Sequence, residues 1–119
     1  MSDKLVLVVE DHRPNARLLG LLVQRCGVTA QMVSNGAEAL LAMQARRPDL
    51  ILLDLMMPIM TGNELLEVMR SDPDLSSIPV VIVTTEEEPH VSTPYGLPYI
   101  RKPFDPAQVQ QVIEELLKE

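Results

Sequence analysis

Five charged or hydroxyl side chains stand at the ends of short apolar runs in the sequence: Glu10, Asp11, Asp54, Thr84 and Lys102. If the runs are parallel strands of one sheet, right-handed crossovers bring these strand ends to one edge, where open α/β sheets bind ligands. Three crowded carboxylates repel one another, which raises their pKa values unless a cation neutralises them. Because Mg²⁺ takes oxygen ligands from one or two carboxylates together with waters and phosphate, these residues predict a Mg²⁺ site.

Asp54 can act as a nucleophile toward phosphorus, because a carboxylate is ionised at pH 7 and needs no general base. The product would be an acyl phosphate. The metal and the Lys102 ammonium would offset negative charge on the transferring phosphoryl group, and the Thr84 hydroxyl would donate a hydrogen bond to one of its oxygens. These residue types therefore predict phosphoryl transfer to Asp54.

The strands that would position these residues are short apolar runs. Residues 5–9, 50–53 and 80–83 are continuously apolar, as is typical of parallel strands buried on both faces. Residues 30–33 and 97–101 are weaker strand candidates. We expect five strands in one sheet.

Helical patterns alternate with these runs. We expect helices from near Pro14 to Gly27, from Asn35 toward Pro48, over residues 62–70, and from Asp105 onward. Asn35 with Glu38 resembles a capping box, and Asp105-Pro106 resembles an N-cap followed by proline at the first helical position. The first helix carries Leu18, Leu19, Leu22, Val23 and Cys26 at helical spacing, and the last is expected to bury Val109, Val112, Ile113, Leu116 and Leu117. This alternation predicts an α/β fold whose parallel sheet is covered on both faces.

Length, composition and charge limit the possible fold and partners. With 119 residues, 46% of them apolar, the chain fits one packed domain over residues 1–119. Its formal charge of −7 disfavours direct binding to nucleic acid or to an anionic membrane surface. Cys26 is the only cysteine, so no intrachain disulfide can form and a reducing cytoplasm fits best. The N-terminus has no signal-peptide pattern, and we expect no membrane insertion.

Four short motifs lie at the predicted strand ends. Residues 9–11 carry an acidic pair, and residues 54–62 have the pattern D-x-x-M-P-x-M-x-G. Residues 83–84 are Val-Thr, and residues 102–104 are Lys-Pro-Phe. These four motifs resemble those of the CheY-like receiver domain of response regulators in two-component signalling. The resemblance covers essentially the whole chain. It implies a flavodoxin-like, doubly wound, five-stranded parallel sheet with strand order 2-1-3-4-5.

The resemblance also implies roles for single residues. Asp54 would be the phospho-acceptor of a stand-alone phosphoprotein in a phosphorelay. Mg²⁺ would be held by Asp11, Asp54 and the backbone carbonyl of Met56, with Glu10 assisting through water. Thr84 and Lys102 would contact the phosphoryl group, Tyr99 would be the switch aromatic that moves inward with Thr84, and the bond before Pro103 would be cis. The phosphoryl donor would be a histidine kinase or a phosphotransfer protein. The module would signal to an unknown downstream protein, with a homodimer possible, and would catalyse only its own phosphorylation and dephosphorylation.

The sequence departs from the family pattern in one region. Thr85 stands where the family usually has a smaller residue, which would narrow access to the acyl phosphate. Thr84 and Lys102 are 18 positions apart, and the family typically has about four more residues there, roughly one helical turn. Prolines 89, 94 and 98 also lie in this stretch, so residues 86–98 read as a loop. We therefore expect the fourth helix of the family to be short or absent.

Three other functions fit parts of the pattern. A receiver-like module that works without phosphorylation would keep the same residues. An aspartyl-phosphate phosphatase needs a second acid two residues after its nucleophile, where this chain has Met56. A flavodoxin-like electron carrier needs a hydroxyl- and glycine-rich loop after the first strand, which is lacking here. His12 and His90 are interpreted as loop histidines without a role, and Cys26 as a small buried apolar side chain.

Overall fold

The sheet has five parallel strands in the order β2-β1-β3-β4-β5. The computed structural model describes residues 4–84 and 97–118. The strands are β1 (Leu5–Val9), β2 (Thr29–Val33), β3 (Leu50–Asp54), β4 (Val80–Thr84) and β5 (Tyr99–Arg101). The strand order that the resemblance implied is confirmed.

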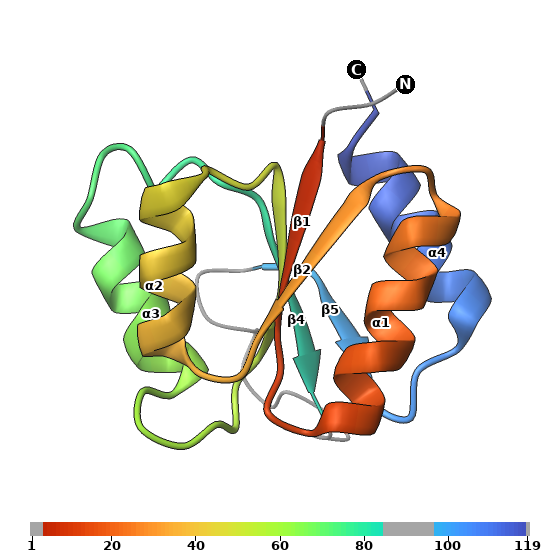
Figure 1. Cartoon of the computed structure of the whole chain (residues 1–119), viewed down its shortest axis with the longest axis horizontal. Helices are drawn as coiled ribbons and strands as arrows, with labels where there is room; N and C mark the ends of the chain where they lie inside the picture. The colour runs from red at the N-terminus through yellow and green to blue at the C-terminus, as the bar shows by residue number, and fades with distance from the viewer. Residues whose placement is uncertain (1–3, 85–96, 119) are drawn as a thin grey trace.

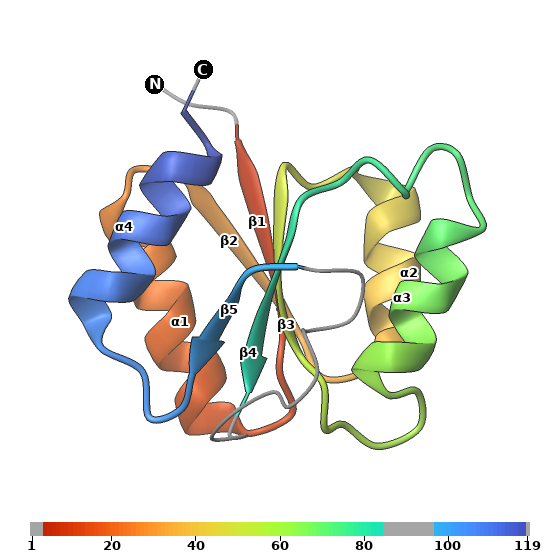
Figure 2. The ribbon, with the colours of Figure 1, turned by 180° about the vertical axis from the view of Figure 1, so that it is seen from behind.

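Two layers of helices cover the sheet (Figure 1). The helices are α1 (Arg13–Arg25), α2 (Gly36–Ala45), α3 (Gly62–Arg70) and α4 (Pro106–Leu116). Figure 2 shows from behind that α1 and α4 lie on one face of the sheet, and α2 and α3 on the other. The chain reverses its direction of winding between β1 and β3, which are hydrogen-bonded neighbours. In doubly wound sheets a ligand binds beyond the carboxyl ends of the strands at this switch point.

The apolar runs supply both halves of the core. Successive side chains of a strand point to opposite faces, so Leu7 and Val9 of β1 pack toward α2 and α3, whereas Val6 and Val8 pack toward α1 and α4. The strands β1, β3 and β4 are buried along their whole length. Their continuous apolar sequence is therefore explained by burial on both faces.

Side-chain caps fix the starts of three helices. The Thr61 hydroxyl accepts a hydrogen bond from the Glu64 backbone N–H, and the Glu64 carboxylate accepts one from the Thr61 N–H, which completes a capping box at α3. Asn35 accepts from the Glu38 backbone N–H at α2, but the Glu38 carboxylate accepts from the backbone N–H and hydroxyl of Ser34. The expected capping box at α2 is therefore only half formed. The Asp105 carboxylate caps α4 by accepting from the Ala107 N–H.

Some expectations about burial are wrong. Leu116 was expected to be buried but is 39% exposed, because it is the last residue of α4. Val112, Leu117 and Cys26 are half-buried at the edge of the core. Apolar residues at the margins of the helix faces are therefore less buried than their helical spacing predicted.

The stretch between β4 and β5 is described only in part. The strand β5 has three residues, so it begins two residues later than expected. The chain has four helices within the described residues. The last of them, α4, follows β5 and has 11 residues. The expectation of a short or absent helix before β5 concerns residues 85–96, which lie outside the described part of the chain. Among the residues described, no helix is long and apolar enough to cross a bilayer.

Candidate functional site

Three carboxylates meet at the carboxyl ends of β1 and β3. The strands are paired so that Val9 lies opposite Leu53, which places Glu10 and Asp54 side by side as the next residues of each strand. One carboxylate oxygen from each of Glu10, Asp11 and Asp54 lies within 4.8 Å of the others. Glu10 and Asp54 are buried, with 3% and 6% of their surfaces exposed, whereas Asp11 is exposed. The sheet edge therefore gathers the carboxylates that the sequence placed at separate strand ends.

Lys102 brings a cation to this cluster from the end of β5. Its Nζ lies 2.6 Å from Glu10 Oε1 and 3.5 Å from Asp54 Oδ2. The backbone N–H of Lys102 donates a 2.6 Å hydrogen bond to the Thr84 carbonyl, so β4 holds the lysine in place. The peptide bond between Lys102 and Pro103 is cis.

The electrostatics of the cluster differ between the two buried carboxylates. Burial, followed by the adjacent Glu10, raises the pKa of Asp54 to about 6, although the Met56 backbone N–H and Lys102 oppose this rise. Burial also acts to raise the pKa of Glu10. However, the contact with Lys102 and the hydrogen bond from the His12 backbone N–H outweigh burial and lower that pKa. Of the two buried carboxylates, Asp54 is therefore the one whose charged form is less stabilised.

The cluster has the chemistry of a site for a hard divalent cation. Three carboxylates face one lysine, so negative charge is in excess. Glu10 Oε1 is buried and has no hydrogen-bond partner within the described residues apart from its ion pair with Lys102. Divalent cations such as Mg²⁺ bind carboxylate oxygens, and such a cation would offset both the burial of the Asp54 carboxylate and the repulsion from Glu10 that together raise the pKa of Asp54. The residues present therefore fit a Mg²⁺ ion.

The loop from β3 to α3 is held close to Asp54. The Met56 backbone N–H donates a 3.1 Å hydrogen bond to Asp54 Oδ1, while the Met56 side chain is 71% exposed. A Cβ atom at position 62 would lie 2.6 Å from the carbonyl oxygen of Asp54, so only glycine fits there. Within the loop, Ile59 has a φ of 68°, a conformation that is strained for a β-branched residue. The motif over residues 54–62 includes Gly62, but no pattern in the sequence predicts the backbone strain at Ile59.

The remaining expected site residues lie around the cluster. Thr84 is buried at the end of β4, where it pairs with Arg101 of β5. Tyr99, at the start of β5, is 44% exposed and pairs with Ile82. His12 is exposed and contributes its backbone N–H to Glu10 rather than its imidazole. Thr85 and His90 lie outside the described residues.

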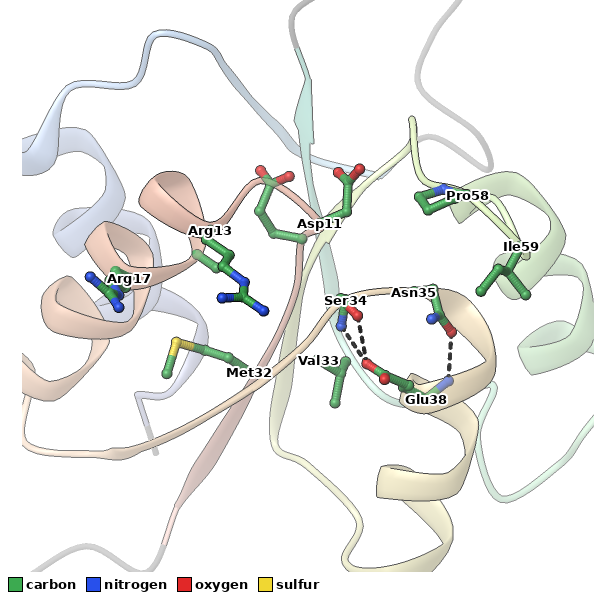
Figure 3. Close-up of a pocket in the computed structure, with 12 residues that line it drawn as sticks. Asp11, Arg13, Arg17, Met32, Val33, Ser34, Asn35, Glu38, Pro58 and Ile59 are labelled. Atoms are coloured by element: carbon green, nitrogen blue, oxygen red, sulfur yellow. Dashed lines mark hydrogen bonds between the residues drawn. The ribbon is translucent and has the colours of Figure 1, made fainter.

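A cleft of about 570 Å³ adjoins the carboxylates. Figure 3 shows Asp11 at one end of this cleft, with Arg13 and Arg17 projecting from α1 and Pro58 and Ile59 on the opposite side. Its lining continues along β2 to Ser34 and Asn35. The sequence analysis did not single out the two arginines, although their spacing of four residues at the start of a helix puts them on one face.

Comparisons with known proteins agree on one family. A model of the response regulator receiver domain matches residues 6–114. The polar-differentiation response regulator DivK of Brucella anthropi is 32% identical over 118 residues, which cover 96% of each chain. The DNA-binding response regulator MtrA of Mycolicibacterium paratuberculosis is 36% identical over 109 residues, or 87% of this chain. The matched part is 47% of MtrA, so the chain spans about half the length of the MtrA relatives.

A solved structure adds an observation on metal binding. The Mn²⁺-bound form of response regulator Rcp1 has a TM-score of 0.83 and 27% identity to this chain. The match covers 97% of this chain and 95% of Rcp1. Rcp1, a structurally similar response regulator, therefore binds a divalent cation.

Proposed function

Because this chain belongs to the response regulator receiver domain family, we propose that it is a phosphorylation switch in which Asp54 accepts a phosphoryl group. Receiver domains are signalling domains rather than classical enzymes. The observation that carries the proposal is the convergence of Glu10, Asp11 and Asp54 within 4.8 Å beside the Lys102 ammonium. This arrangement supplies a nucleophile, candidate metal ligands and a cation at one point.

The transfer would begin with attack by Asp54. One of its carboxylate oxygens forms a bond to phosphorus, the bond from phosphorus to the leaving group breaks, and the electron pair stays with the leaving group. Although the pKa of Asp54 is raised to about 6, the carboxylate is mostly ionised at pH 7 and above. No general base is needed.

The carboxylates of Asp11 and Asp54, with the backbone carbonyl of Met56, would hold Mg²⁺ directly. The ion would supply positive charge that stabilises the oxygens of the phosphoryl group during transfer. Asp11 is the exposed member of the set, so it would also take part in exchange of the ion with solvent. Glu10 would act through water, since its Oε1 is already paired with Lys102.

Lys102 and Thr84 would convert phosphorylation into a change of shape. The Lys102 ammonium lies between Glu10 and Asp54, so a phosphoryl group on Asp54 would attract it away from Glu10. The Thr84 hydroxyl would donate a hydrogen bond to the phosphoryl group, and the partly exposed Tyr99 would move inward with it. The change would select one of two pre-existing surfaces for a downstream protein.

The phosphoryl donor would be a histidine kinase or a phosphotransfer protein. The chain would also catalyse its own dephosphorylation. We place it in the cytoplasm as one domain over residues 1–119, acting without direct contact to nucleic acid. A homodimer is compatible with this function.

Intact mass measurement tests the proposal. After incubation with acetyl phosphate and Mg²⁺, the wild-type chain should gain the mass of one HPO₃ group. The Asp54→Asn variant and a sample with EDTA should gain none, since they lack the acceptor and the metal. A gain that persists in the variant would overturn the assignment of Asp54.

A further inference from the structure

A close contact joins the start of α2 to the loop that follows β3. Gly36 is the first residue of α2 and is buried. A Cβ atom at this position would lie 2.7 Å from Cγ and 2.9 Å from Cβ of Met60. Because Cβ of Met60 is attached to the backbone, the methionine cannot turn away from an added methyl group without a shift of the main chain. The glycine therefore lets the loop lie directly against the helix.

Nothing in the helix itself requires glycine at position 36. Its backbone is helical and its φ lies outside the left-handed region, so alanine can adopt the same conformation. Glycine is also a poor helix former, whereas alanine is the best. The glycine is therefore explained by the approach of Met60 and not by the helix.

A backbone hydrogen bond supports the same contact. The Gly36 N–H donates to the Met60 carbonyl over 3.3 Å. The first N–H groups of a helix have no acceptor within the helix, so the loop uses a donor that α2 leaves unsatisfied. The Met60 side chain is half-buried and packs against the core on the α2 and α3 side of the sheet. Both the side chain and the backbone of Met60 are thus held in place at α2.

The loop that runs from Met60 back to the acceptor is short, and Pro58 and Ile59 mark it in Figure 3. The Met60 N–H donates a 2.7 Å hydrogen bond to the Pro58 carbonyl. At the other end of the loop the Met56 N–H donates to Asp54 Oδ1, and the Met56 carbonyl is one of the proposed Mg²⁺ ligands. Only three residues separate Met56 from Met60. A shift of Met60 is therefore passed on to the Met56 carbonyl.

We propose that Gly36 and Met60 are positioning residues for the Mg²⁺ site: the start of α2 holds Met60, and Met60 fixes the Met56 carbonyl beside Asp54. The inference rests on the proposed function. Neither residue touches the metal or the phosphoryl group, so both act through the loop. A contact that served the fold alone would change the unfolding free energy in EDTA and leave the Mg²⁺ affinity of the folded protein as it is.

The first test is the Mg²⁺ affinity of Gly36→Ala, measured by calorimetry. It should be about tenfold weaker than that of the wild type, the order found when groups that orient metal ligands are changed. Gly20→Ala is the matched control in α1, since its Cβ would meet only the mobile end of an exposed side chain, at 3.0 Å from Met32 Sδ. This control should keep the wild-type affinity. Equal affinities of the two variants would overturn the proposal.

The second test asks whether the two residues act on the metal site together. Met60→Ala removes the Cγ and Sδ atoms that an alanine at position 36 would contact. In the Met60→Ala background, Gly36→Ala should therefore weaken Mg²⁺ binding by at most about threefold, because effects of residues in contact are not additive. A full tenfold loss in this background would show that Gly36 acts by another route and would contradict the proposal.

A metal-free measurement separates failure of this inference from failure of the proposed function. The Gly62 N–H donates to the Leu55 carbonyl across the base of the loop, so its hydrogen exchange in EDTA reports whether the loop is held. Relative to the amides of β1, this proton should exchange at least about fivefold faster in Gly36→Ala than in Gly20→Ala. If the wild type binds no Mg²⁺, the proposed function fails. Equal exchange rates in the two variants would instead show that α2 does not hold the loop, and the positioning role would be wrong.

Discussion

The ammonium of Lys102 lies 2.6 Å from Oε1 of Glu10, closer than its 3.5 Å distance to Oδ2 of Asp54. Both partners of the shorter contact are largely buried, with 10% and 1% of their side-chain surfaces exposed. The lysine therefore neutralises the carboxylate beside the acceptor and leaves the acceptor itself only partly compensated. This asymmetry agrees with the opposite shifts of the two pKa values, downward for Glu10 and upward for Asp54.

Removal of the lysine should destabilise the fold. Lys102→Ala leaves Glu10 and Asp54 buried without their cation, and breaking a buried ion pair in this way costs about 3 kcal/mol. Far-UV circular dichroism during urea unfolding in EDTA would measure the loss. Lys118→Ala removes an exposed lysine at the end of the chain and should change the unfolding free energy little. Mg²⁺ should still bind Lys102→Ala, because its carboxylate ligands remain. Equal stability of the two variants would show that the ion pair is not maintained in solution.

The stability of the metal-free protein should depend on the ionisation of Asp54. Its pKa is about 6 in the folded chain and 3.8 when unperturbed, so the folded state binds more protons between these values. Stability contributed by this group is then present below about pH 4 and is lost as the pH rises through 6. Asp54→Asn cannot ionise and should be more stable than the wild type at pH 7.5 in EDTA, by at most about 3 kcal/mol.

Urea unfolding of both proteins at pH 4.5 and pH 7.5 would check this dependence. The advantage of Asp54→Asn should be small at the lower pH and should shrink again at pH 7.5 when Mg²⁺ is added, since the metal stabilises only a site with the charged acceptor. A variant that is less stable than the wild type at pH 7.5 in EDTA would refute the raised pKa.

Substitution of Gly62 should disturb the metal site as well as the fold. A Cβ at this position would lie 2.6 Å from the Asp54 carbonyl oxygen and 2.7 Å from the Leu55 Cα, both backbone atoms that cannot move aside freely. Gly62→Ala should cost about 1–3 kcal/mol of unfolding free energy and weaken Mg²⁺ binding measured by calorimetry. Gly27→Ala makes no close contact but is strained by its φ of +80°, so it should lower stability without changing Mg²⁺ affinity.

Relief of the strain at Ile59 should stabilise the protein. The side chain is 82% exposed and its φ is 68°, so little packing compensates for the unfavourable backbone conformation. Ile59→Asn should raise the unfolding free energy by about 1 kcal/mol, because asparagine tolerates this region. Ile59→Val keeps the β-branch and should give no gain. If the two variants unfold at the same urea concentration, the loop does not hold this strain in solution.

The sequence predicts those parts of the molecule that depend on local patterns. Continuous apolar runs mark strands buried on both faces, and the four motifs fix the order of the strand ends at which Glu10, Asp54 and Lys102 meet. Helical spacing identifies an apolar face but not where the sheet beneath it ends. For that reason the exposure of Leu116 was predicted wrongly.

Other features depend on how distant segments come together in space. The preference of Lys102 for Glu10 follows from the positions of three strand ends, and no spacing in the sequence indicates it. The cleft with Arg13 and Arg17 arises where α1, β2 and the loop after β3 meet, so it becomes visible only in the folded chain. The positive φ of Ile59 contradicts the local preference of isoleucine, and it lies in a turn in which the Met60 N–H donates a hydrogen bond to the Pro58 carbonyl.

The position of the phosphoryl group tests the central claim most directly. Borohydride reduces an acyl phosphate of aspartate to homoserine, which peptide mass spectrometry can locate after labelling with acetyl phosphate and Mg²⁺. We predict homoserine at position 54 and at no other carboxylate, since Asp54 is the buried strand-end carboxylate with its charge least compensated. Reduction at Glu10 or Asp11, or a phosphoryl group on His12, would contradict the account.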